Sequence, residues 1–160
     1  MNNQLKHYKY GGARALVLLH EQELRKLLDV WRVAKARDLA LPETEDVDYE
    51  SLETLLVHNL RSARGYMNWI CESLELDDPQ INETPDIEQV EDVAEEYIEH
   101  LLERWRLPLA DLAPERYGEV YKAWGDMPMC IEAMLEHAVM HPIRHSFQLN
   151  NLLAESDKND

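Results

Sequence analysis

The stretch "EHAVMHPIRHSFQL", residues 136–149, places histidines at positions 137, 141 and 145. A spacing of four residues brings side chains to one face of a helix. The surrounding segment, about 129–154, is apolar on most sides, which predicts a helix at the centre of the molecule. At 100° per residue, His145 points about 20° from the inward direction, His141 about 60° and His137 about 100°. We therefore expect His141 and His145 to point into the protein and His137 to lie at its edge.

Pro142 bears on which of these histidines could share a metal ion. A proline inside a helix removes one amide donor and crowds the carbonyl four residues earlier, so we expect a distortion between 138 and 142. The pair His137 and His141 spans that distortion, whereas His141 and His145 lie mostly beyond it. Neutral imidazoles four residues apart on a helix can chelate zinc or a similar ion. His141 and His145 are the predicted pair, and a third ligand must come from elsewhere.

Three further helical patterns precede this stretch, at about 13–39, 49–76 and 86–106. They predict an all-α fold, a four-helix bundle, in a single domain over residues 1–160. Asp48 is a candidate N-cap for the second helix and Thr84 for the third. The third helix has a predicted inward face (Ile87, Val90, Ala94, Tyr97, Leu101 and Trp105) and an acidic outer face (Glu88, Glu91, Asp92, Glu95, Glu99 and Glu103).

A long irregular connection, 107–128, joins the third and fourth predicted helices, and a short helix is expected near 115–123. Connections of this length usually have a function, so we expect it to form the wall of a pocket. Its aromatic residues, Tyr117, Tyr121 and Trp124, are the candidates for that wall. Ordinary packing is the alternative role for the same side chains.

The charge of the chain excludes some partners. Sixteen Lys and Arg against 32 Asp and Glu give a net charge of −16. Such an acidic chain is expected to bind neither nucleic acid, whose affinity for proteins depends on phosphate contacts, nor an anionic membrane. The sequence shows no signal peptide and no apolar run of transmembrane length. Its two cysteines make no disulfide framework, so a reducing cytoplasmic location is expected.

The histidine that completes a metal site is not decided by periodicity. His7 lies near the N-terminus, and His100 lies beside the acidic face of the third predicted helix. His20 lies in the apolar stripe of the first helix, and His58 lies on the flank of the second helix's stripe. Periodicity favours His20, although a lone histidine on an apolar face is more often a hydrogen-bonded core residue. The sequence has no Glu-x-x-His and no His-Glu-x-x-His, against a ferritin-like di-iron bundle and a zincin protease.

Two short segments, "LLVHNL" at 55–60 and "HPIRHSFQL" at 141–149, resemble the DinB/YfiT-like superfamily of metal-binding four-helix bundles. In that family one histidine of the second helix and a His-x-x-x-His pair of the fourth hold the metal. The resemblance therefore implies His58, His141 and His145 as ligands. The family often has His-Arg-Gly-Gln at the end of this motif, and here only Gln148 matches. Pro142 within the pair is a second departure.

The resemblance implies a metal-dependent enzyme that activates a low-molecular-weight thiol and transfers it to a small electrophile. Zinc or nickel is the expected ion, a small molecule the expected partner, and a homodimer the assembly common among relatives. Gln148, on a similar face to His141, is expected to orient a ligand or the substrate from behind the metal site. His20 stays a candidate for a fourth ligand or a pocket residue. The alternative is a non-catalytic stress-response or small-molecule-binding bundle with structural histidines.

Overall fold

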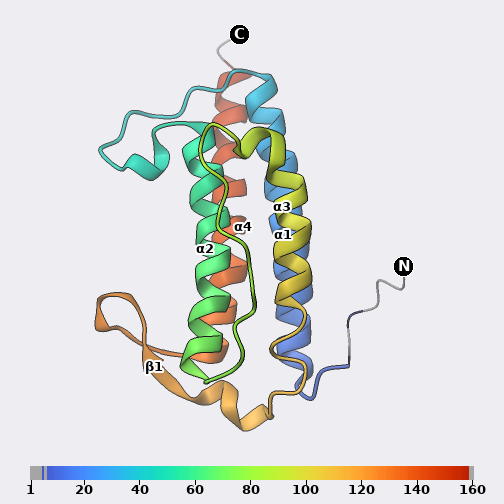
Figure 1. The fold of residues 1–160 in the computed structure, drawn as a ribbon. Helices are drawn as coiled ribbons and strands as arrows, with labels where there is room; N and C mark the ends of the chain where they lie inside the picture. The colour runs from blue at the N-terminus through green and yellow to red at the C-terminus, as the bar shows by residue number, and fades with distance from the viewer. Residues whose placement is uncertain (1–4, 6, 159–160) are drawn as a thin grey trace.

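The chain folds into four long α-helices joined by connections of different lengths (Figure 1). The structure, a computed structural model, describes residue 5 and residues 7–158. The helices are α1 (Gly11–Ala36), α2 (Leu52–Ser73), α3 (Val90–Trp105) and α4 (Ile131–Ser156). Among the described residues the architecture is thus mainly helical, as the sequence predicts, and the predicted helix ends lie within four residues of the observed ones.

Helices α1 and α4 run in the same direction, and α2 and α3 run opposite to them (Figure 1). The α1–α4 pair is held at both ends. Tyr10 donates a hydrogen bond of 2.5 Å to Glu132 at the start of the pair. Arg37 contacts Asp157 at 2.8 Å at its end. These two contacts have almost the same sequence offset, 122 and 120 residues, which fixes the parallel register of the two helices.

The link between α2 and α3 must cross the length of the bundle, because both helices run the same way (Figure 1). Residues 74–89 make this crossing. Tyr97 of α3 donates to the carbonyl of Asn82 at 3.0 Å, and Arg64 of α2 donates to the carbonyl of Ile81 at 3.2 Å. Ile81 is buried. The crossing segment is therefore bound to both helices along its path.

The connection between α3 and α4 lies at one end of the bundle (Figure 1). It contains the 3-10 turns η2 (Pro114–Gly118) and η3 (Trp124–Asp126). Two short antiparallel strands, β1 (Val120–Lys122) and β2 (Pro128–Cys130), lie on either side of η3 in the chain, with Tyr121 opposite Met129. The sequence predicts a short helix near 115–123. The structure has a 3-10 turn over the first part of that range and strand β1 over the second part.

Three local expectations are wrong. Ser51, not Asp48, caps α2, because its side chain accepts the amide of Thr54 in a reciprocal capping box. Gln89, not Thr84, occupies the N-cap position of α3. Ile87 precedes that helix and is 46 % exposed rather than inward.

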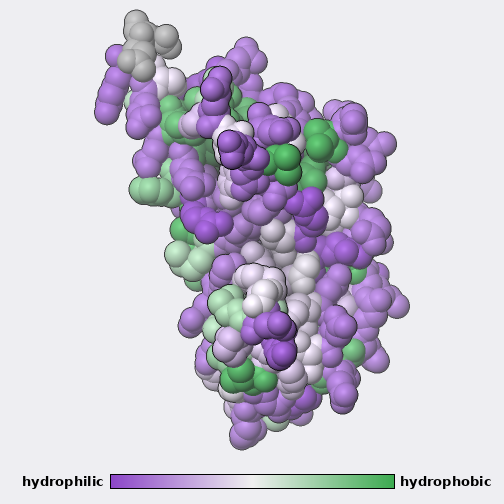
Figure 2. Space-filling model, turned by 90° about the vertical axis from the view of Figure 1, so that its left-hand side faces the viewer, coloured by the Kyte–Doolittle hydropathy of each residue, from purple (hydrophilic) through white to green (hydrophobic). Residues whose placement is uncertain are grey.

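Buried side chains of all four helices form the core. The outer surface that Figure 2 shows is mostly hydrophilic, with hydrophobic side chains in small separate groups. No helix within the described part of the chain is long and apolar enough to cross a membrane. Cys71 and Cys130 are both free thiols.

Candidate metal centre

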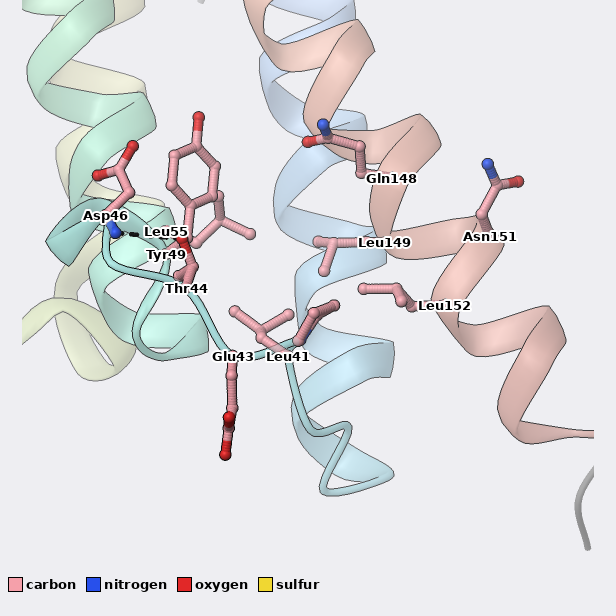
Figure 3. Close-up of a pocket in the computed structure, with 11 residues that line it drawn as sticks. Leu41, Glu43, Thr44, Asp46, Tyr49, Leu55, Gln148, Leu149, Asn151 and Leu152 are labelled. Atoms are coloured by element: carbon pink, nitrogen blue, oxygen red, sulfur yellow. Dashed lines mark hydrogen bonds between the residues drawn. The ribbon is translucent and has the colours of Figure 1, made fainter.

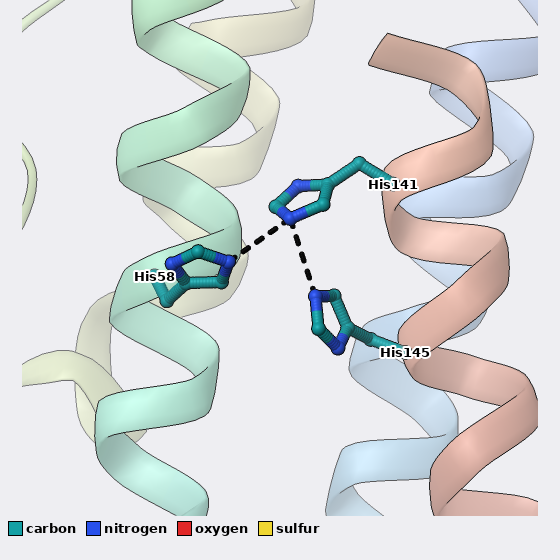
Figure 4. Close-up of side chains that lie close together, drawn as sticks. All are labelled: His58, His141 and His145. Atoms are coloured by element: carbon teal, nitrogen blue, oxygen red, sulfur yellow. Dashed lines mark hydrogen bonds between the residues drawn. The ribbon is translucent and has the colours of Figure 1, made fainter. Parts of the chain in front are cut away.

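Three histidines from two helices meet between α2 and α4 (Figure 4). His58 comes from α2, and His141 and His145 come from successive turns of α4. The Nε2 atom of His141 lies 3.0 Å from that of His58 and 3.2 Å from that of His145. One ligand atom from each residue lies within 4.8 Å of the others. These are the three residues that the family resemblance implies.

The side chain of His58 is held by a carboxylate. Its Nδ1–H donates to Oδ2 of Asp48 at 3.0 Å, and the other oxygen of Asp48 accepts from Arg61 at 2.6 Å. A carboxylate can only accept, so this contact places the proton of a neutral His58 on Nδ1 and leaves the Nε2 lone pair free. Burial alone would raise the pKa of Asp48, but Arg61 and His58 outweigh it and hold that pKa below its usual range.

His145 is held in the same way by an amide. Its Nδ1 lies 2.9 Å from Oε1 of Gln148, which accepts the Nδ1 proton and leaves Nε2 free. Gln148 thus contacts one of the three histidines directly, and its expected role behind a metal ion stays a prediction. Pro142 lies inside α4, which continues as one helix from Ile131 to Ser156. The expected distortion thus leaves the helix unbroken and His141 and His145 on one face.

The three histidines are in their neutral forms near pH 7. Burial lowers the pKa of His141 to about 2, and the neighbouring imidazoles His145 and His58 add to the effect. Burial also lowers the pKa of His145 to about 4, with Arg144 as the next cause. Burial lowers the pKa of His58 although Asp48 opposes it. Neutral imidazole is the form that binds a metal.

The arrangement of nitrogen atoms fits a divalent ion. With the Nδ1 protons committed to Asp48 and Gln148, the Nε2 atoms of His58 and His145 both present lone pairs. His141 can donate to only one of them, so three nitrogens approach with at most one proton among them. Two ligand nitrogens of a tetrahedral zinc ion lie about 3.3 Å apart, given Zn–N distances of about 2.0–2.1 Å. The observed 3.0 and 3.2 Å are close to this spacing.

His137 lies outside this group, as its position on the helix predicts. Its ring centroid is 6.4 Å from that of His141, and it packs edge-on against Tyr66. His20 is not part of the group either. Its ring is buried and stacks on Trp105, with centroids 3.9 Å apart and an interplanar angle of 17°. His20 therefore belongs to the core, but neither of its ring nitrogens has a hydrogen-bond partner among the described residues, so the expected hydrogen bond of a core histidine is not found.

The aromatic residues of the 107–128 connection lie away from the three histidines. Tyr117 is buried and donates to the carbonyl of Leu109 at 3.1 Å. Tyr121 donates to Glu119 at 2.5 Å. Trp124 is 50 % exposed and lies 5.3 Å, between ring centroids, from His137. The tyrosines beside the centre come instead from other segments. The ring centroid of Tyr49 is 5.5 Å from that of His145 and 5.6 Å from that of His58, and the ring centroid of Tyr66 is 5.8 Å from that of His141.

Sequence reasoning missed Asp48 and Tyr49 as residues of the site. The available signal was the rule that a metal-binding histidine usually donates its second N–H to a carboxylate or carbonyl. With 32 Asp and Glu in the chain, that rule alone does not select one residue. Comparison with known proteins gave no match, as no family model, no curated protein and no solved structure matches this chain.

Proposed function

We propose that the protein binds one divalent transition metal ion through Nε2 of His58, His141 and His145 and uses it in an enzymatic reaction on a small molecule. The observation that carries the proposal is the approach of three neutral imidazoles with two of their Nδ1 protons already committed. Three protein ligands are typical of catalytic zinc sites, which keep one position open, whereas structural sites usually have four. Zinc and nickel both suit an all-imidazole site.

The reaction that we propose is transfer of a low-molecular-weight thiol to a small electrophile, as the resemblance to the DinB/YfiT-like superfamily implies. A metal ion in such a site lowers the pKa of a coordinated thiol or water, so that the anion attacks. Asp48 and Gln148 fix the direction in which His58 and His145 present Nε2. Burial of His141 and His145 excludes bulk water from that side of the centre.

The test is the metal content of purified protein that has not met a chelator. We expect about one ion per chain in the wild type and in His137→Ala. We expect His58→Ala, His141→Ala and His145→Ala each to lose stoichiometric metal, since two imidazoles hold a divalent ion weakly. Loss in His137→Ala with retention in His145→Ala would contradict the assignment of the ligands.

Turnover separates the enzyme from a non-catalytic binding bundle. The metal-loaded protein is mixed with 1-chloro-2,4-dinitrobenzene and a small thiol, and release of chloride as the thioether forms is followed. We expect a rate that requires the metal and disappears in His145→Ala. Full metal occupancy without turnover of any thiol and electrophile pair would favour the alternative, a small-molecule-binding bundle with structural histidines.

A further inference from the structure

A cavity of about 460 Å³ lies beside the three histidines, between the α1–α2 connection and the last turns of α4 (Figure 3). Its lining residues come from the connection, from α2 and from α4: Leu41, Pro42, Glu43, Thr44, Asp46 and Tyr49 from the connection, Leu55 from α2, and Gln148, Leu149, Asn151 and Leu152 from α4. This volume falls within the range of small-molecule sites, about 300–1,000 Å³. The cavity is therefore large enough for a ligand of the size of a short alkyl or aryl compound.

Two residues belong both to this cavity and to the surroundings of the metal centre. Gln148 lines the cavity and accepts a hydrogen bond from Nδ1 of His145. Tyr49 lines the cavity and packs near both His58 and His145. Figure 3 shows the Tyr49 ring and the Gln148 amide at one end, with the Glu43 side chain at the other. One end of the cavity thus adjoins the three histidines.

The walls of the cavity are mostly apolar, and its charged groups are acidic. The aliphatic side chains are Leu41, Pro42, Leu55, Leu149 and Leu152. The charged residues of the lining are Glu43 and Asp46, both exposed at its rim, and none of the described residues that line the cavity is Lys or Arg. An apolar body would be favoured by the walls, whereas an anionic group would be repelled by two carboxylates without a cationic neighbour in the lining.

We propose that this cavity binds the apolar part of the substrate, and that the group carried there is uncharged or a protonated amine, not a carboxylate. The proposal rests on the proposed function in naming the occupant a substrate. The reactive end of the bound substrate lies toward Tyr49 and Gln148, next to the metal centre, and the far end of the substrate lies toward Glu43. Selection against carboxylates follows from Glu43 and Asp46.

Three probes of equal length test this selection: hexylammonium, 1-hexanol and hexanoate. Their dissociation constants for the full-length protein are measured by calorimetry, once with zinc and once with a chelator. We expect hexylammonium to bind about tenfold more tightly than hexanoate, with 1-hexanol between them, because the sign of the charge reverses its interaction with both carboxylates. Equal or tighter binding of hexanoate in the chelated protein would overturn the proposal.

Variants locate the binding. Leu152→Trp and Leu41→Trp each fill the cavity and should weaken hexylammonium binding at least about tenfold, as a displaced ligand of this size loses most of its apolar contact. Leu107→Trp is the matched control, since Leu107 is 52 % exposed beyond the end of α3. Circular dichroism verifies that each variant folds. Unchanged binding in both folded cavity variants would show that the ligand lies elsewhere.

Glu43→Gln tests the charge. It should reduce the preference for hexylammonium over hexanoate about threefold, while Glu103→Gln on the exposed face of α3 leaves it unchanged. The same preference in Glu43→Gln as in the wild type would contradict the role of this carboxylate. Binding in the chelated protein does not need the metal. Probe binding in the chelated protein tests the cavity, and the metal content of the purified protein tests the metal site. The two proposals can therefore fail independently.

Discussion

Asp48 accepts a hydrogen bond of 3.0 Å from Nδ1 of His58, and this contact joins the turn before α2 to the three-histidine group. Asp48 lies in η1 (Val47–Tyr49), three residues ahead of the cap of α2. Because the carboxylate fixes the ring and its tautomer, the α1–α2 connection takes part in building the site. The same connection supplies Tyr49 and the cavity wall.

Removing this carboxylate should weaken metal binding. We expect Asp48→Ala to lower zinc affinity about 10- to 100-fold, the range found for outer partners of metal-bound histidines. Asp48→Asn should lower zinc affinity less, because its amide oxygen still accepts the hydrogen bond from Nδ1 of His58. Competition with a chromophoric chelator measures both, and Asp111→Ala, at an exposed acid distant in sequence, is the control. Wild-type affinity in Asp48→Ala would show that His58 does not depend on this contact.

Gln148 offers a test in two directions. Gln148→Leu leaves Nδ1 of His145 without its acceptor, and we expect zinc affinity to fall up to about tenfold. Gln148→Glu replaces the amide by a charged acceptor and should raise affinity a fewfold, since charge-assisted hydrogen bonds are stronger. Asn151→Asp adds a charge to the same cavity wall without a hydrogen bond to a ligand. An equal rise in Asn151→Asp would assign the effect to charge alone.

Metal binding should also stabilise the fold, because the three ligands join α2 to α4. Free zinc at about 100 times its dissociation constant should raise the free energy of unfolding by about 2.7 kcal/mol. For a chain of 160 residues, this corresponds to an increase in Tm of roughly 5–10 °C. Thermal unfolding with zinc and with chelator measures the difference. His137→Ala should keep the increase, and an unchanged Tm in the wild type would contradict metal binding to the native state.

Much of the fold was predictable from the sequence because the helices have continuous apolar stripes. The angular positions of His145, His141 and His137 on α4 also follow from helix geometry alone. His58 did not follow in this way, because its position on the flank of a stripe gives it no advantage over His20. The resemblance supplied it. Asp48 was interpreted as a cap because an acid just before a helix fits both roles, and only the tertiary arrangement distinguishes them.

The cavity beside the histidines is lined by a different connection from the one that the sequence analysis expected to wall a pocket. The 107–128 segment is long and aromatic, but it lies at the end of the bundle where α3 ends and α4 begins. His58 is in the second turn of α2, near the opposite end, and His145 is about 21 Å along α4 from its start. The shorter 37–51 connection is therefore the one beside the histidines. Connection length predicts that a segment has a role, but not which site it adjoins.

The buried ring of His20 should make stability depend on pH. The side chain is 1 % exposed and stacks on Trp105, and neither ring nitrogen has a hydrogen-bond partner among the described residues. Burial lowers the pKa of His20 to about 3, from 6.5 in the unfolded chain. As pH falls from 6.5 toward 3, His20 becomes protonated in the unfolded state but stays neutral in the folded state. His20 therefore lowers the free energy of unfolding by about 1.4 kcal/mol per pH unit in that window.

His20→Phe removes this proton while keeping an aromatic ring against Trp105. At pH 7 we expect its free energy of unfolding to lie within about 1 kcal/mol of the wild type, because the histidine is neutral in both states. Between pH 7 and pH 4 the difference in free energy of unfolding, variant minus wild type, should rise by about 3 kcal/mol in favour of the variant. Urea unfolding followed by circular dichroism, with chelator present, measures this from pH 7 to 4. The exposed His7→Phe should track the wild type, and a constant difference between His20→Phe and wild type across this range would mean that His20 is protonated in the folded protein as readily as in the unfolded chain.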